Sequence, residues 1–167
     1  MIRSFSGKTP RIAESAFVSE WAYVVGDVEV GENSSVWPGA VIRGDFGTIK
    51  IGKNTHIEDN CVLHAGTAME IGDNVMIGHS VVVHCAKIGN NVLVGNNATV
   101  LDNAEIGDFC IIGANAVVRQ GEKVPSRSFM VGVPAKITGE VPAERLTRRE
   151  GNSTYADLSQ RYKAQGL

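Results

Sequence analysis

The sequence predicts an all-β solenoid followed by a C-terminal α-helical segment, because one six-residue pattern runs through most of its 167 residues. An aliphatic residue recurs every six positions, and the residue four places later is usually small, as at Ala16, Ala40 and Cys61. These two inward positions describe a flat rung followed by a tight corner. Gly and Asn fall at the expected corners, as at Asn54 and Asn74, where positive φ or side-chain-to-backbone bonds are needed. The aliphatic positions are Ile12, Val18, Val24, Val30, Val36, Ile42, Ile51, Ile57, Leu63, Ile71, Ile77, Val83, Ile88, Val94, Val100, Ile106, Ile112, Val118 and Val124.

The period breaks three times, and every break falls between residues 42 and 88. The spacing is nine positions from Ile42 to Ile51, eight from Leu63 to Ile71, and only five from Val83 to the next aliphatic residue. Interruptions in a repeat usually map to surface loops, often at the binding face. We therefore expect the functional residues in this part of the chain.

The repeat ends at Val124, and residues 131–136 are expected to form an exit strand. We predict a β-helix domain over residues 1–137 and a C-terminal helical segment over residues 138–167 that packs on the solenoid. Within this segment, Pro142 suits the first turn of one helix, and Asn152 or Ser153 can cap a second. The second helix would carry one apolar stripe, formed by Tyr155, Leu158 and Tyr162.

Composition narrows the class of protein. The net charge of −2 argues against nucleic acid as a partner, because phosphate binding needs clustered Lys and Arg. No apolar run reaches the ~20 residues that span a bilayer, and the N-terminus lacks the apolar region of a signal peptide. The three cysteines are odd in number and form no spaced framework, which predicts reduced thiols in the cytoplasm.

The four histidines lie within 29 residues, at positions 56, 64, 79 and 84. If three repeats make one coil, Leu63 and Val83 stack directly, so His64 and His84 are outward neighbours ~4.8 Å apart. Two imidazoles at that spacing can share one metal ion. His79 lies on the preceding face, too far around to join them within one chain, but it could meet them across a subunit boundary in a three-fold ring. His56 receives no role.

Three segments resemble the γ-class carbonic anhydrase family of the hexapeptide-repeat superfamily: Arg43-Gly44-Asp45, residues 59–64 and residues 78–84. The resemblance covers nearly the whole chain. It implies a left-handed parallel β-helix with three hexapeptides per triangular coil, assembled as a homotrimer. It also implies a Zn²⁺ ion (or Fe²⁺ or Co²⁺) at each interface. The ligands it implies are His64 and His84 of one subunit and His79 of the next.

The activity that the resemblance implies is reversible hydration of CO₂ to bicarbonate by a metal-bound hydroxide. It also implies that Arg43 pairs with an aspartate across the interface, and Asp45 and Asp59 both suit that role. Glu58 stands where the family often has Gln. An ionised Glu only accepts hydrogen bonds, so Glu58 would act as a base or weaken catalysis.

Further positions complete the expected site. Phe46, and the short loop at residues 65–70, stand where the best-studied members carry acidic groups for proton transfer, so turnover is expected to be slower. Tyr155 or Asn152 from the terminal helix can supply a polar group above the metal. The catalytic candidates are therefore Glu58, Tyr155 and Asn152.

Other functions stay open on the sequence. A hexapeptide-repeat acyltransferase would use a histidine as base and take an acyl group from coenzyme A or acyl carrier protein. A thioesterase could act on a coenzyme A thioester at the same metal, and a non-catalytic trimer could bind metal alone. Metal content separates the acyltransferase from the other three readings.

Overall fold

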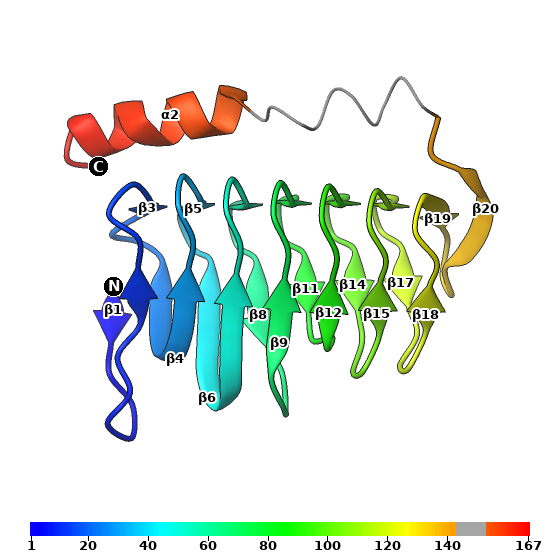
Figure 1. Ribbon diagram of the computed structural model, residues 1–167, viewed down its shortest axis with the longest axis horizontal. Helices are drawn as coiled ribbons and strands as arrows, with labels where there is room; N and C mark the ends of the chain where they lie inside the picture. The colour runs from blue at the N-terminus through cyan, green and yellow to red at the C-terminus, as the bar shows by residue number, and fades with distance from the viewer. Residues whose placement is uncertain (143–152) are drawn as a thin grey trace.

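The computed structural model describes residues 1–142 and 153–167, and the predicted parallel β-helix with a C-terminal helix is confirmed (Figure 1). Two-residue rungs stack in register through parallel pairs, so each inward aliphatic residue lies on the equivalent residue of the next coil. The rungs form three flat faces, which we name the β8, β9 and β7 faces after one strand of each.

The β8 face contains the first halves of β4 (Tyr23–Val30) and β6 (Val41–Ile51), then β8 (Val62–His64), β11 (Val82–Val83), β14 (Thr99–Val100) and β17 (Val117–Val118). The β9 face contains β2 (Arg11–Ile12), the second halves of β4 and β6, β9 (Met69–Ile71), β12 (Lys87–Ile88), β15 (Glu105–Ile106) and β18 (Lys123–Val124). The β7 face contains β3 (Phe17–Val18), β5 (Ser35–Val36), β7 (His56–Ile57), β10 (Met76–Ile77), β13 (Leu93–Val94), β16 (Ile111–Ile112) and β19 (Ser128–Val131). Strand β1 (Ile2–Arg3) pairs with β4, and β20 (Lys136–Glu140) pairs antiparallel with β19.

The core is a narrow column of the aliphatic and small residues that the repeat predicts. All three cysteines are buried in it or at its corners, and none forms a disulfide within the described residues. The corners also follow the prediction, because Asn54, Asn74, Asn91 and Asn97 all adopt positive φ. Left-handed backbone at these positions lets the chain turn tightly at each corner.

All three breaks of the period fall at one corner of the solenoid, between the β8 and β9 faces. The expectation of a surface loop after Ile42 was wrong, because β6 continues as a strand through Ile51. It pairs with β4 on both sides of a bulge, over residues 41–44 and 49–51. The physical reason is the close approach of two backbones. A β-carbon at Gly44 would overlap the backbone carbonyl of Asp27, so only Gly lets the strands stay paired around the bend.

Helix α2 (Ser153–Ala164) packs on the β7 face near the N-terminal end of the solenoid (Figure 1). Tyr162 lies between Phe17 and Trp37, with ring centroids 5.9 and 5.0 Å away, and Leu158 is half-buried. The predicted apolar stripe of this helix is thus confirmed. Among the described residues, no helix is long and apolar enough to cross a membrane.

The exit strand expected over residues 131–136 was wrong, because the chain turns at residues 132–135, where Gly132 adopts positive φ, between β19 and β20. Other expectations for the C-terminal region are not tested. Sheet pairing continues to Glu140, a little beyond the expected division at residue 137, and that division stays a prediction. The helix expected after Pro142 and the cap at Asn152 fall in the segment 143–152, outside the described residues.

Candidate metal centre

His64 and His84 are stacked as the repeat predicts. Leu63 pairs in register with Val83, so the two histidines leave the ends of β8 and β11 on the same side. Their ring centroids are 5.2 Å apart, and His64 Nδ1 lies 3.2 Å from His84 Nε2. Arg43 precedes them in the same outward row, paired in register with His64.

A carboxylate holds the far nitrogen of each of these rings. His64 Nε2 lies 2.9 Å from Asp45 Oδ1, and His84 Nδ1 lies 2.9 Å from Asp102 Oδ1. Because a carboxylate only accepts, these partners assign the ring protons to the far nitrogens of the neutral imidazoles. The two nitrogens that face each other therefore both present lone pairs. Such an arrangement is favourable only with a proton or a cation between them.

Their separation fits a metal ion. Two nitrogens bound to one tetrahedral ion at about 2.05 Å each would lie roughly 3.3 Å apart. Metal-bound histidines also usually donate their other N–H to a carboxylate or a carbonyl. The separation of the two nitrogens and their carboxylate partners are both present in the protein itself, so His64 and His84 fit a divalent cation.

Asp45 also binds Arg43 within the same chain, at 2.6 Å between Arg43 Nη1 and Asp45 Oδ2. Burial alone would raise the pKa of Asp45, but the hydrogen bond from His64 and the charge of Arg43 lower it below its ordinary value. Asp45 thus stays ionised beside His64. The pairing of Arg43 with an aspartate across a subunit interface stays a prediction, and Asp59 contacts His79 instead of Arg43.

His79 lies at the next corner, between the β7 and β8 faces, and does not join the pair. Its Nε2 lies 3.0 Å from Glu58 Oε2, and its Nδ1 lies 3.0 Å from Asp59 Oδ2. Within the part of a single chain that the structure describes, no three His, Cys, Asp or Glu side chains converge to hold a metal. This agrees with the expectation that His79 cannot complete the site of its own chain.

Glu58 and Tyr155 gather at the same corner as His79. Glu58 is buried, and Tyr155 reaches it from helix α2. Burial, and then the hydrogen bond and charge of Glu58, raise the pKa of Tyr155 to about 12. The structure therefore brings Glu58, Tyr155 and His79 together, away from His64 and His84 of the same chain. Asn152, the third catalytic candidate, lies outside the described residues.

His56 has a structural environment that sequence reasoning did not find. It is fully buried under α2, with Nδ1 2.7 Å from Ser35 Oγ and its ring centroid 5.6 Å from that of Tyr155. Ser35 Oγ also accepts a hydrogen bond from Trp37 Nε1 at 2.8 Å. Burial lowers the pKa of His56 to about 4, so this histidine is neutral at physiological pH.

The interrupted corner creates a small pocket beside His84. The turn after Val83 is one residue shorter than the repeat, the turn after Leu63 on the preceding coil is two residues longer, and the turn after Val100 on the following coil is regular. A pocket of about 230 Å³ opens there, lined by Ala65, Gly66, Thr67, His84, Cys85, Asp102 and Asn103. Asp102 was missed from the sequence because the predicted outward row ended at Leu101, one residue earlier.

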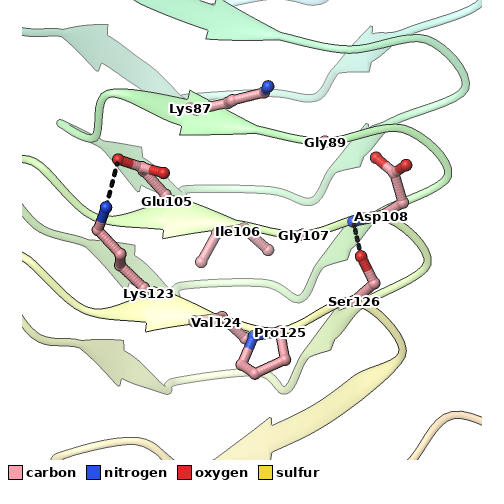
Figure 2. Close-up of a pocket in the computed structure, with 10 residues that line it drawn as sticks. All are labelled: Lys87, Gly89, Glu105, Ile106, Gly107, Asp108, Lys123, Val124, Pro125 and Ser126. Atoms are coloured by element: carbon pink, nitrogen blue, oxygen red, sulfur yellow. Dashed lines mark hydrogen bonds and ion pairs between the residues drawn. The ribbon is translucent and has the colours of Figure 1, made fainter.

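A larger groove lies elsewhere, on the β9 face (Figure 2). Lys87, Glu105 and Lys123 line it side by side, and Lys123 Nζ lies 3.4 Å from Glu105 Oε1. On its other side the Asp108 N–H donates to Ser126 Oγ at 3.0 Å. Opposite charges that pair with each other leave little attraction for a charged ligand. We assign this groove no part in the site.

Comparison with known proteins supplies the family. The model of the bacterial transferase hexapeptide family, with six repeats, matches residues 9–44, 68–100 and 85–120. The chain is 35% identical over 167 residues to "Gamma carbonic anhydrase 1, mitochondrial" of Arabidopsis thaliana, covering 95% of this chain and 61% of the plant protein. It is 45% identical over 152 residues to the "Probable carbonic anhydrase" of Methanocaldococcus jannaschii, covering 89% of this chain and 96% of that protein.

A solved structure from Bacillus cereus, described as a candidate acetyltransferase, is 38% identical and matches with a TM-score of 0.94, covering 98% of this chain and 97% of that one. The repeat and these matches define the class as hexapeptide-repeat β-helix proteins. Within that class the chain belongs to the γ-class carbonic anhydrase-like family. It spans about three fifths of the length of the plant relative.

Proposed function

We propose that this protein catalyses the metal-dependent, reversible hydration of CO₂ to bicarbonate at sites between the subunits of a homotrimer. The observation that carries the proposal is that His64 Nδ1 and His84 Nε2 face each other at 3.2 Å, and with a proton on each far nitrogen both direct a lone pair inward. Asp45 and Asp102 fix both rings in that state from outside. A general base on an isolated histidine would need no such pair.

An apolar row on the β8 face supports the assembly. Beside the histidine row, Val62 and Val82 are 37% and 36% exposed and pair in register with Val41 and Thr99. A flat, exposed aliphatic row next to an incomplete site suits burial against another copy of the chain. His79 of that copy would then complete the ligand set, with Nδ1 kept on Asp59 and Nε2 released by Glu58.

The roles of the remaining residues follow from their positions. A divalent cation at this site would supply a nucleophile by lowering the pKa of a water molecule to near neutrality. Glu58 accompanies His79 to the interface and can accept a proton there, and Tyr155 donates a hydrogen bond to it. Phe46 is 73% exposed with its ring 5.5 Å from that of His64, so it offers an apolar wall suited to CO₂.

An acyltransferase is the second candidate, favoured by the description of the Bacillus cereus structure at 38% identity. In that reaction a histidine would remove a proton from the acceptor. The lone pairs of His64 and His84 oppose each other and are partly shielded, which suits cation binding better than proton abstraction. A thioesterase and a non-catalytic metal-binding trimer remain as outcomes of the test.

The test measures metal content and CO₂ hydration in the same anaerobic preparation. We expect about one Zn²⁺, Fe²⁺ or Co²⁺ per subunit, with hydration measurable by stopped flow and both lost in His79→Ala. Metal without hydration, after reconstitution with each ion, would favour the thioesterase or the binding trimer. No metal in any preparation would overturn the proposal in favour of the acyltransferase.

A further inference from the structure

We infer that Asp102 is a positioning residue that fixes the tautomer and orientation of His84 for metal binding, and this inference rests on the proposed function. Asp102 Oδ1 lies 2.9 Å from His84 Nδ1. The neutral ring donates through Nδ1 and keeps its lone pair on Nε2, which is the atom that faces His64. Asp102 thus decides which nitrogen is free to bind the cation.

The backbone of the next coil holds Asp102 in place independently of the histidine. The Leu101 N–H donates to the Val118 carbonyl at 3.1 Å, and the Gly121 N–H donates to the Asp102 carbonyl at 2.8 Å. These bonds belong to the regular stacking of the solenoid. The coil therefore fixes the backbone of Asp102, and its carboxylate already lies at hydrogen-bond distance from His84 Nδ1.

The pocket beside His84 explains why a carboxylate is needed at this position. His84 and Asp102 both line the pocket, and their side chains are 30% and 47% exposed, so replacing Asp102 would leave His84 Nδ1 to water. A solvated imidazole exchanges between its two tautomers, and one of these places the proton on Nε2. An acceptor-only group at Nδ1 removes that tautomer and adds electron density to the ligand.

Asp102 also offers a cleaner test than its counterpart Asp45. Asp45 binds both His64 and Arg43, so its replacement would disturb two interactions at once. Glu122 supplies the matched control. It carries the same charge on the following coil, where it pairs with Arg119 at 3.0 Å.

The experiment measures Zn²⁺ affinity of the full-length protein by competition with a chromogenic chelator, together with the visible spectrum of the Co²⁺-loaded protein. We expect Asp102→Ala to weaken Zn²⁺ binding about 10–100-fold and to alter the Co²⁺ bands. Asp102→Asn should lose less affinity and keep bands closer to wild type, because its amide oxygen still accepts from Nδ1–H. Glu122→Gln should stay within about two-fold of wild type.

If both Asp102 variants keep the Zn²⁺ affinity and the Co²⁺ bands of the wild type, the inference is overturned. The proposed function would then still stand if the wild type hydrates CO₂. A wild-type protein that binds none of Zn²⁺, Fe²⁺ and Co²⁺ would overturn both. If Asp102→Ala fails to fold, Asp102→Leu, which fills the space but cannot accept from Nδ1–H, decides by the same two measurements.

Discussion

The four histidines lie close together in the sequence, yet their partners give them three different environments. His64 and His84 each have one carboxylate and one free lone pair. His79 has a carboxylate at both nitrogens, and His56 has only Ser35 and an apolar cover. Only the first environment suits a metal ligand without rearrangement. The hydrogen-bond partners therefore distinguish histidines that cannot be told apart by residue type alone.

The buried His56 gives a prediction on acid stability. Its folded-state pKa of about 4 lies below the ordinary value of 6.5. The contribution of the neutral ring to the unfolding free energy is therefore fully present above pH 6.5. This stabilisation is lost as the pH falls through 6.5 toward 4. Between these pH values, wild type should lose up to about 3 kcal/mol more unfolding free energy than His56→Gln. Urea denaturation at several pH values tests this, and parallel pH profiles of the two proteins would contradict it.

At the scale of elements, strand β6 and helix α2 place the side chains of the site. Strand β6 bends around the interrupted corner and carries Asp45 to His64. Helix α2 covers His56 and brings Tyr155 to Glu58. Strand β6 depends on the close approach of two backbones. Helix α2 is held by aromatic packing and by hydrogen bonds that Gln160 and Lys163 donate to backbone carbonyls of residues 14–16.

Two glycines test the bend of β6. A β-carbon at Gly44 would overlap the backbone of β4, whereas one at Gly66, in the neighbouring turn, would meet nothing within 4 Å. Gly44→Ala should therefore destabilise the fold by roughly 1–3 kcal/mol and weaken Zn²⁺ binding by displacing Asp45. Gly66→Ala should stay within about 0.5 kcal/mol of wild type. Urea denaturation provides the comparison, and equal stabilities would refute the role of the close approach.

Tyr162 tests the docking of α2. Removal of its ring abolishes the edge contacts with Phe17 and Trp37, each worth about 0.5–1.5 kcal/mol beyond the area buried. We expect Tyr162→Ala to speed amide hydrogen exchange in α2 while the β10–β16 rungs keep their protection. Tyr23→Ala, on the β8 face, serves as control. Unchanged exchange in α2 would show that other contacts hold the helix.

At the scale of the whole molecule, the three faces differ in what they can bind. The β7 face carries α2 on its N-terminal part. The β9 face bears a row of alternating charges in register, so each charge lies opposite its partner. These are Arg11, Glu29, Lys50, Glu70, Lys87, Glu105 and Lys123. The β8 face, with its aliphatic row, is therefore the one best suited to association between copies.

Val82→Lys on this face tests the assembly. A charge buried without a partner at a subunit interface is strongly unfavourable, so the variant should run as a monomer in light scattering and lose bound metal. Its solenoid should keep the far-ultraviolet circular dichroism of wild type. Val133→Lys, at an exposed residue near the far end of the solenoid, should remain assembled. A trimeric, metal-bound Val82→Lys protein would place the interface elsewhere.

The sequence by itself determined the solenoid, its inward residues, its Asn corners and the stacking of His64 on His84. Because the repeat is regular, the position of a residue in the solenoid can be counted from the sequence. The stacking of Leu63 on Val83 could therefore be predicted without a structure. The separation of His79 from that pair followed from the same arithmetic. The terminal helix followed from the spacing of its aromatic stripe.

Only the tertiary structure decided which groups touch the histidines. Asp102 lies past the end of the counted row, so its contact with His84 could not be counted from the repeat. The continuous strand β6 depends on the fit of Gly44 against another backbone, and the burial of His56 depends on a helix that lies far from it in sequence. The repeat determines which residues point inward in each coil. The side-chain partners at the interrupted corner and beneath helix α2 are determined only when the chain packs on itself.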